Sequence, residues 1–229
     1  MLKTITPNQN RTSWHKYKKY SLPLAAAVLV IFHAVGFWGL LFSGEPVYFQ
    51  NLTPMNLLLT NTLLFSFHKC WNKAFILFAA VVFAVGFLSE VIGIHTGLLF
   101  GDYTYGDALG FKVWEVPVLI GLNWLMLVYT TGHISNFTNW HWVAKAILGA
   151  TLMVLLDFFI EPVAMQFDFW SWRQGEIPLS NYAGWLVVAL LLQLYFQKAD
   201  FRKQNKLAPY VYVVQVLFFV SIYLLLTPQ

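Results

Sequence analysis

The sequence predicts an all-α protein, a polytopic membrane helix bundle with about seven transmembrane helices and two long outer loops. Of its 229 residues, 59% are apolar and only 10% are charged, and the mean hydropathy is +0.61. Soluble domains carry roughly 25% charged residues, so this chain has too few polar side chains to cover a soluble globule. It also contains apolar segments close to the roughly 20 residues that a helix needs to cross a bilayer.

Seven such segments can be delimited, and together they predict one transmembrane domain over residues 21–229. The second segment is short, so six or eight crossings stay open. Residues 1–20 form a polar, basic segment, and no small-residue cleavage site follows residue 42, which favours a retained first helix over a removed signal. The seven segments are 21–42, 54–68, 75–94, 117–135, 142–163, 182–199 and 208–226.

The charges predict an orientation in the cytoplasmic membrane. With the N-terminus in the cytoplasm, every Lys and Arg except Lys112 and Arg173 lies on the inner side, as the positive-inside rule requires. These cations flank apolar segments and form no stripe, which argues against a nucleic-acid partner. Every Asp and Glu except Asp200 lies toward the outer side. Because acids contribute little to topology, this bias indicates a shared acidic site near the outer face.

Two loops on that face, 95–116 and 164–181, are rich in Gly, aromatic residues and acids. Long loops of this kind are typical of site walls and lids. Gly93, Gly97 and Gly101 recur every four residues, which favours a small-residue packing stripe on a helix.

A weak internal repeat accompanies the loops. Glu90 and Phe100 precede Asp157 and Phe167 by 67 positions. Each unit runs as a helix, an acidic aromatic loop and a helix that begins near a proline. A parallel duplication would bring two carboxylate-bearing helices together, as repeat interfaces in membrane proteins often do.

Three carboxyl groups are the candidate catalytic residues. Asp157 and Glu161 lie four residues apart and therefore share one helix face, and Glu90 lies near the outer end of the third segment. Acids inside a membrane usually face an interior or a cavity. Since burial and mutual repulsion both favour the neutral form of a carboxyl, at least one of the three is expected to hold a proton near neutral pH. A general acid would then stand beside a general base.

No metal or cofactor is predicted. Cys70 is the single cysteine, which excludes an intramolecular disulfide and a cysteine-built metal centre, and the six histidines show no clustered spacing. Three other functions stay open: a proton-coupled transporter that uses the same carboxylates, a cofactor-binding electron-transfer subunit, and a non-catalytic scaffold.

Over roughly residues 75–195 the chain resembles the membrane carotenoid hydratases of carotenoid biosynthesis. The likeness rests on "SEVIGIHTGLLFGDYTYG", "VPVLIGLNW", "LLDFFIEPV", "FWSW" and "IPLSNYAGW", in this order. The family adds water to the acyclic ψ-end of carotenoids such as lycopene, γ-carotene or bisanhydrobacterioruberin. Glu115 departs from the pattern, since a small residue is expected before "VP", and it is left outside the site.

The resemblance implies a cofactor-independent hydratase whose partners are a carotenoid, water and membrane lipid, and which can meet other enzymes of the pathway. In the mechanism that we infer, Asp157 protonates the terminal double bond to a tertiary carbocation, and Glu90 or Glu161 takes a proton from the added water. Aromatic rings beside the acids would line the polyene site and face the cation. The expected substrate-binding residues are Phe100, Tyr103, Tyr105, Trp124, Trp170, Trp172, Asn181, Tyr182 and Trp185.

Overall fold

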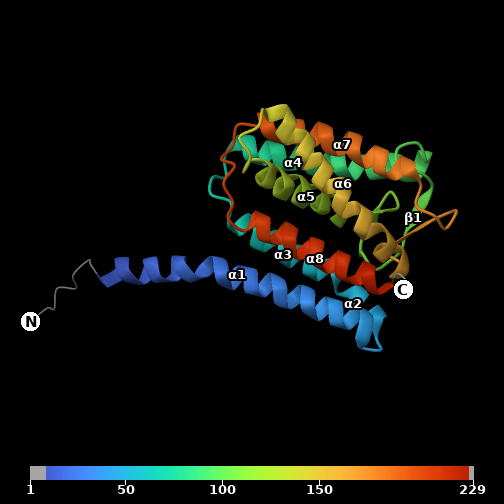
Figure 1. The fold of residues 1–229 in the computed structure, drawn as a ribbon, viewed down its shortest axis with the longest axis horizontal. Helices are drawn as coiled ribbons and strands as arrows, with labels where there is room; N and C mark the ends of the chain where they lie inside the picture. The colour runs from blue at the N-terminus through green and yellow to red at the C-terminus, as the bar shows by residue number, and fades with distance from the viewer. Residues whose placement is uncertain (1–8, 227–229) are drawn as a thin grey trace, which may run out of the picture.

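The computed structural model describes residues 9–226, with side chains from residue 21 onward, and most of this chain is helical. Figure 1 shows the helices side by side in one bundle, with the connections gathered at its two ends. Residues 1–8 of the predicted N-terminal segment lie outside the described part. The helices are α1 (Gln9–Phe42), α2 (Pro46–Asn51), α3 (Thr53–Ser66), α4 (Lys73–Thr96), α5 (Leu119–Ser135), α6 (Trp142–Gln166), α7 (Leu179–Lys198) and α8 (Ala208–Leu226).

The predicted class, an all-α membrane bundle, agrees with this architecture. Five described helices are long and apolar enough to cross a membrane: the Ser21–Phe42 part of α1, and α4, α6, α7 and α8. Helices α3 and α5 are shorter, with 14 and 17 residues. At 1.5 Å per residue, α3 extends only about 21 Å, in keeping with the short second segment of the sequence.

The predicted first segment, 21–42, coincides with the part of α1 that is long and apolar enough to cross a membrane, Ser21–Phe42, and the helix itself begins further back, at Gln9. Hydropathy locates only the apolar part of a helix. Residues 9–20 contain neither Gly nor Pro, so nothing in them interrupts the backbone hydrogen bonds.

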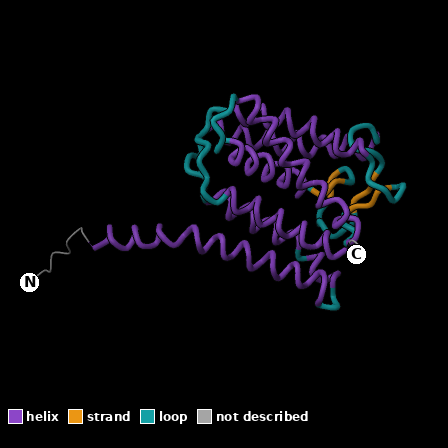
Figure 2. The backbone as a smooth tube through the Cα atoms, viewed as in Figure 1, coloured by secondary structure: helices purple, strands orange, loops and turns teal. Residues whose placement is uncertain are grey.

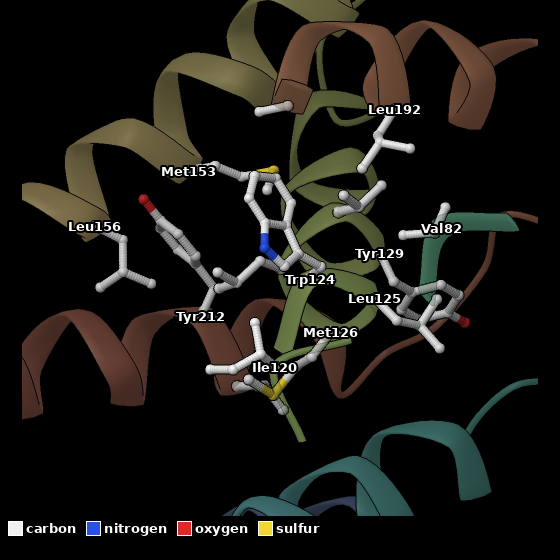
Figure 3. Close-up of a cluster of buried hydrophobic side chains, with 14 of the residues drawn as sticks. Val82, Ile120, Trp124, Leu125, Met126, Tyr129, Met153, Leu156, Leu192 and Tyr212 are labelled. Atoms are coloured by element: carbon white, nitrogen blue, oxygen red, sulfur yellow. The ribbon is translucent and has the colours of Figure 1, made fainter. Parts of the chain in front are cut away.

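Helix α5 forms the centre of the bundle. Every residue from Trp124 to His133 is buried, because α3, α4, α6, α7 and α8 all contact this helix. Figure 3 shows Trp124 and Tyr129 of α5 in one cluster of buried side chains with Val82 of α4 and Met153 of α6. The threonine and serine hydroxyl groups of α5 donate to carbonyl groups about one turn earlier, for example Thr131 Oγ1 to Leu127 O at 2.7 Å, so a partly polar helix is tolerated inside.

Two short ribbons cover one end of the bundle (Figure 2). Strands β1 (Tyr103–Tyr105) and β4 (Trp170–Trp172) pair antiparallel, as do β2 (Lys112–Val113) and β3 (Val116–Pro117). The first ribbon therefore joins the loop after α4 to the loop after α6. These are the two loops that the sequence singled out, and the structure brings them together.

The register of this ribbon matches the internal repeat. A shift of 67 positions carries β1 onto β4, residue by residue, and the middle residues Thr104 and Ser171 lie opposite each other. Antiparallel pairing centred on equivalent residues is the arrangement that a local two-fold axis produces. In the following helices, Trp124 and Trp185 stack with ring centroids 4.3 Å apart.

The predicted glycine stripe is wrong, because α4 ends at Thr96 before the stripe is complete. Gly97 adopts φ 66° and caps the helix, its N–H donating to Gly93 O at 2.8 Å. The chain then turns back against α7, where a Cβ on Gly184 would lie 2.2 Å from Leu99 O. Only glycine permits this close approach, which holds the loop before β1 against α7.

Candidate functional site

Glu90 is a buried carboxyl, 4% exposed, on the last turns of α4. Its Oε2 accepts hydrogen bonds from the hydroxyl groups of Tyr103 and Tyr105, the second at 2.9 Å. Its Oε1 accepts the indole N–H of Trp124 at 3.0 Å. Trp124 can reach this position because Gly86 of α4 leaves room, since a Cβ there would lie 2.4 Å from the Trp124 side chain.

Glu161 on α6, 2% exposed, has a corresponding environment. Its Oε2 accepts the indole N–H groups of Trp170 and Trp172 at 2.9 and 2.8 Å, and its Oε1 accepts Asn181 Nδ2 at 3.0 Å. In both cases a ribbon strand donates two hydrogen bonds to one oxygen and a following helix donates one to the other. Such donors offset the cost of removing a carboxyl group from water.

Asp157, one turn before Glu161, is fully buried. Asn181 Nδ2 donates to Asp157 Oδ2 at 3.0 Å and to Glu161 Oε1 at the same distance. One amide group therefore links the two carboxyls that the sequence placed on one helix face. No described protein group donates to Asp157 Oδ1.

The ribbon connects the two glutamate environments. The rings of Tyr103 and Trp172 lie 5.0 Å apart, and those of Tyr105 and Trp170 lie 5.9 Å apart. Burial and the neighbouring Glu90 raise the pKa of both Tyr103 and Tyr105 well above the ordinary value for tyrosine. Both hydroxyl groups stay protonated and act as hydrogen-bond donors.

A small cavity of about 40 Å³ lies between Glu90 and Glu161, and we refer to it as the acid cavity. A cavity of this size has room for water, which needs about 10–15 Å³. Its walls are mostly residues that the sequence predicted for the site. The lining residues are Glu90, Tyr103, Tyr105, Ile120, Asn123, Trp124, Glu161, Trp170, Trp172, Asn181 and Trp185.

Three predicted site residues lie outside this lining. Asp157 accepts a hydrogen bond from Asn181, which lines the acid cavity, but does not line it itself. Phe100 is buried beside Tyr103 and Gly93 and supports the wall from outside. Tyr182 lies on another side of α7, with its ring 5.9 Å from Phe158. Neighbouring positions on a helix face different directions, which explains why Asn181 lines the cavity and Tyr182 does not.

Sequence reasoning missed Asn123 of α5. Its side chain lines the acid cavity, and no described protein group donates to its buried Oδ1. The available signal was its spacing, since Asn123 directly precedes Trp124 in "VPVLIGLNW" and follows Ile120 by three residues. Glu115, in contrast, is exposed and lies 3.8 Å from His95, away from the acid cavity.

The two cations that departed from the positive-inside pattern have local partners. Lys112 Nζ lies 2.7 Å from Asp107, and Arg173 Nε lies 2.9 Å from Asp102. Lys112 also lowers the pKa of the Asp107 carboxyl. Asp107 and Asp102 lie in the loops beside the ribbons, and these cations, Lys112 of β2 and Arg173 just after β4, neutralise them.

A second cavity, of about 250 Å³, lies between α1, α3, α8 and the end of α6. Its walls are mostly apolar and include Phe32, Phe49, Phe169, Phe218 and Phe219. We refer to it as the apolar cavity. Among the described residues, no group of three or more His, Cys, Asp or Glu side chains has an arrangement suited to a metal ion.

One family of known proteins matches most of this chain. The family model described as "Carotenoid biosynthesis protein" matches residues 52–228. The chain belongs to the carotenoid biosynthesis protein family. The matched range contains α3 to α8, both ribbons and all three buried carboxyls, so the acid cavity lies wholly within the family's region.

One curated relative is a bisanhydrobacterioruberin hydratase from Haloarcula japonica, 25% identical over 139 residues. The alignment covers 53% of this chain and 46% of the relative, so the chain spans about half the length of that protein. No solved structure matches the chain significantly.

The hydrogen bonds to Glu161 predict a stability effect. Trp172→Phe keeps an aromatic ring but removes one of the two donors to Glu161 Oε2. We expect a loss of about 1 kcal/mol, the net contribution of one hydrogen bond, because Trp170 still donates to the same oxygen. Thermal unfolding in detergent should show a lower melting temperature, whereas Trp140→Phe, at a residue 57% exposed, should leave it unchanged. Equal melting temperatures for the two variants would contradict this assignment.

Proposed function

We propose that this member of the carotenoid biosynthesis family is a hydratase that adds water to the terminal ψ-end double bond of an acyclic or monocyclic carotenoid of the lycopene or γ-carotene type. The single observation that carries the proposal is the acid cavity, in which two buried carboxyls face one small space inside an aromatic wall. The name of the Haloarcula japonica relative supports the reaction class.

The reaction uses only acid–base chemistry on the substrate. A carboxylic acid gives its proton to the less substituted carbon of the double bond, and a tertiary carbocation forms at the other carbon. Water adds to the cation, and a carboxylate removes the extra proton, which yields a tertiary alcohol. Atoms and charge balance without an oxidant or reductant, and the enzyme returns to its starting state once the base passes its proton back.

The three carboxyls take different parts in this scheme. Glu161 and Glu90 face the acid cavity, so we assign the proton donor to Glu161 and the base to Glu90. Asp157, to which the sequence analysis assigned the proton donor, does not line the acid cavity. It accepts a hydrogen bond from the same Asn181 amide group as Glu161. Two carboxyls so close together resist carrying two charges, and in this proposal they hold one proton between them.

The aromatic wall suits the intermediate. Tyr103, Trp172 and Trp185 line the acid cavity beside the glutamates, and their ring faces attract a cation. A rigid apolar wall also limits the entry of further water, so that the cation meets few competing groups.

We further propose seven crossings of the cytoplasmic membrane, by α1 and α3 to α8, with the N-terminus in the cytoplasm and the ribbons outside. The cations near the other end of the bundle support this orientation, among them Lys69, Lys73, Lys145 and Lys198. A C40 polyene is about as long as the hydrocarbon core is thick, roughly 30 Å, so one end can lie near the outer face where acids and water meet.

Replacing the carboxyls should stop the reaction. In cells that make lycopene or γ-carotene, Glu161→Gln and Glu90→Gln should each lower the formation of the hydroxylated product about 100-fold or more, as expected for loss of a general acid or base. Asp157→Asn should lower it less, because Asp157 does not face the acid cavity. Mass spectrometry of the pigments, which detects the addition of one water molecule, measures the effect.

Glu115→Gln is the matched control, since Glu115 is exposed and outside the acid cavity. Full product formation by both Glu161→Gln and Glu90→Gln would remove these residues from the mechanism.

The orientation is tested separately. Reporter domains that are active only outside the cytoplasm should give a signal when fused after Asp107 and after Gly175, which follow β1 and β4. A fusion after Lys203, between α7 and α8, should give none. A signal from the last fusion alone would reverse the proposed orientation and would leave the fold unchanged.

A further inference from the structure

The apolar cavity has the chemistry of a site for a hydrocarbon chain. Its wall is mostly apolar, and phenylalanine rings from α1, α2 and α8 and from the segment before β4 contribute to it. It opens where Phe32 and Val35 of α1 are about half exposed, on the face of the bundle that meets lipid. A long apolar molecule could therefore enter sideways from the membrane without crossing water.

The apolar cavity also adjoins the acid cavity. Phe169 lines the first and its neighbour Trp170 lines the second. On α6, Val163 lines the first and Glu161 the second. The two cavities are thus lined by neighbouring residues of the same two short stretches of chain, and Glu161 lies two residues from the wall of the apolar cavity.

We propose that the apolar cavity binds the polyene chain of the carotenoid. This inference rests on the proposed function, which supplies the class of ligand. At about 250 Å³, the cavity holds one part of the chain, and the remainder lies along α1 in the lipid. The conjugated chain stacks against the phenylalanine rings, and its end is presented to the acid cavity past Phe169 and Trp170.

Gly36 of α1 offers a direct test by filling the cavity. A Cβ at this position would meet only Phe218 Cε2, at the ordinary contact distance of 3.7 Å. A leucine there extends into the cavity, whereas Ala34→Leu adds a similar volume on a face of α1 that does not line it. Both variants are made in a Glu161→Gln background, so that binding is measured without turnover.

Each protein is purified in mild detergent from cells that make lycopene, and the pigment bound per protein is measured by visible absorbance. The parent and Ala34→Leu should retain pigment, and Gly36→Leu should retain at least about fivefold less. Equal retention by both leucine variants would overturn the binding site. Pigment retention with no hydration by the wild-type protein would uphold the site and overturn the hydratase.

A smaller substitution at the same position tests the site if Gly36→Leu does not fold. Gly36→Cys in a Cys70→Ser background can be labelled with an apolar maleimide, and bound lycopene should slow the labelling at least about fivefold. Ala34→Cys should be labelled at the same rate with and without lycopene. Lack of protection at residue 36 would also overturn the site.

A second inference concerns the source of water, and a different observation carries it. The acid cavity contains a buried acceptor, Asn123 Oδ1, to which no described protein group donates. The same cavity is lined by Glu90, whose carboxylate is the proposed base. A water molecule between them would donate one hydrogen to Asn123 Oδ1 and the other to Glu90, and its lone pair would point toward the remaining space. We infer that Asn123 positions the water that attacks the carbocation.

This role concerns only the second step of the reaction, the addition of water, and not the first step, the protonation of the alkene. Without a positioned water, Glu161 still protonates the alkene, and the cation can lose a proton from a neighbouring carbon to re-form the double bond. In heavy water this reversal places deuterium in the recovered substrate. Asn123→Leu should therefore lower the ratio of hydration to deuterium exchange about tenfold or more, the effect of one lost hydrogen bond at the upper end of its usual range.

Three comparisons make the result specific. Glu161→Gln should lose hydration and exchange together, Asn123→Asp should recover much of the hydration because it keeps an acceptor oxygen, and Asn136→Leu at the far end of α5 should change neither. If Asn123→Leu reduces both processes by the same factor, or leaves hydration unchanged, Asn123 does not position the water. Exchange without hydration in the wild-type protein would overturn the proposed function instead.

Discussion

The constraint on which this end of the bundle depends is that a carboxyl group buried in a membrane protein needs hydrogen-bond donors. Glu90 and Glu161 obtain them from rings on β1 and β4, two strands that the helices alone would not require. The ribbon must then lie directly over the ends of α4 and α6. Gly184 helps to hold the ribbon in this place, because its lack of a side chain lets the loop before β1 pack against α7. The loops are thus fixed by the acids beneath them.

Hydropathy and charge were sufficient to predict the class of fold, the approximate position of every helix except the short α2, and the acidic end of the bundle. They were insufficient where the outcome depends on local backbone geometry. Gly93, Gly97 and Gly101 have helical spacing, yet Gly97 adopts a left-handed conformation and ends α4. Hydropathy predicted the apolar part of α1, Ser21–Phe42, and not its continuation back to Gln9, because a helix can extend into a polar segment that hydropathy does not detect.

The sequence was likewise sufficient to predict one part of the candidate site and insufficient to predict another. The sequence identified the three carboxyls and most of the aromatic wall, because acids in apolar segments and aromatic residues beside them are visible in a linear pattern. It did not reveal which side chains face a common space. That depends on the rotation of each helix about its axis, which places Asn123 and Asn181 in the lining and leaves Asp157 and Tyr182 outside it.

The approximate two-fold arrangement is broken at the acids. The sequence shift of 67 positions carries Glu90 onto Asp157, but Glu161 is the residue that shares the pattern of ring donors. The carboxyl with the matching donors thus lies one helical turn after the position that the shift predicts, and α6 has an acid at both positions. Two symmetric halves would give two equivalent carboxyls, whereas the proton donor and the base that we propose must differ, and this displacement would supply the difference.

Helix α5 has a consequence for how the protein is made. A segment enclosed on all sides by other helices exposes no surface to lipid, and its own side chains, with two threonines and a histidine in the buried stretch, favour the bilayer only weakly. We expect such a segment to be stable in the bilayer only together with its neighbours. Because α6, α7 and α8 contact α5 and follow it in the chain, the centre of the protein would be complete only after these three helices have been synthesised.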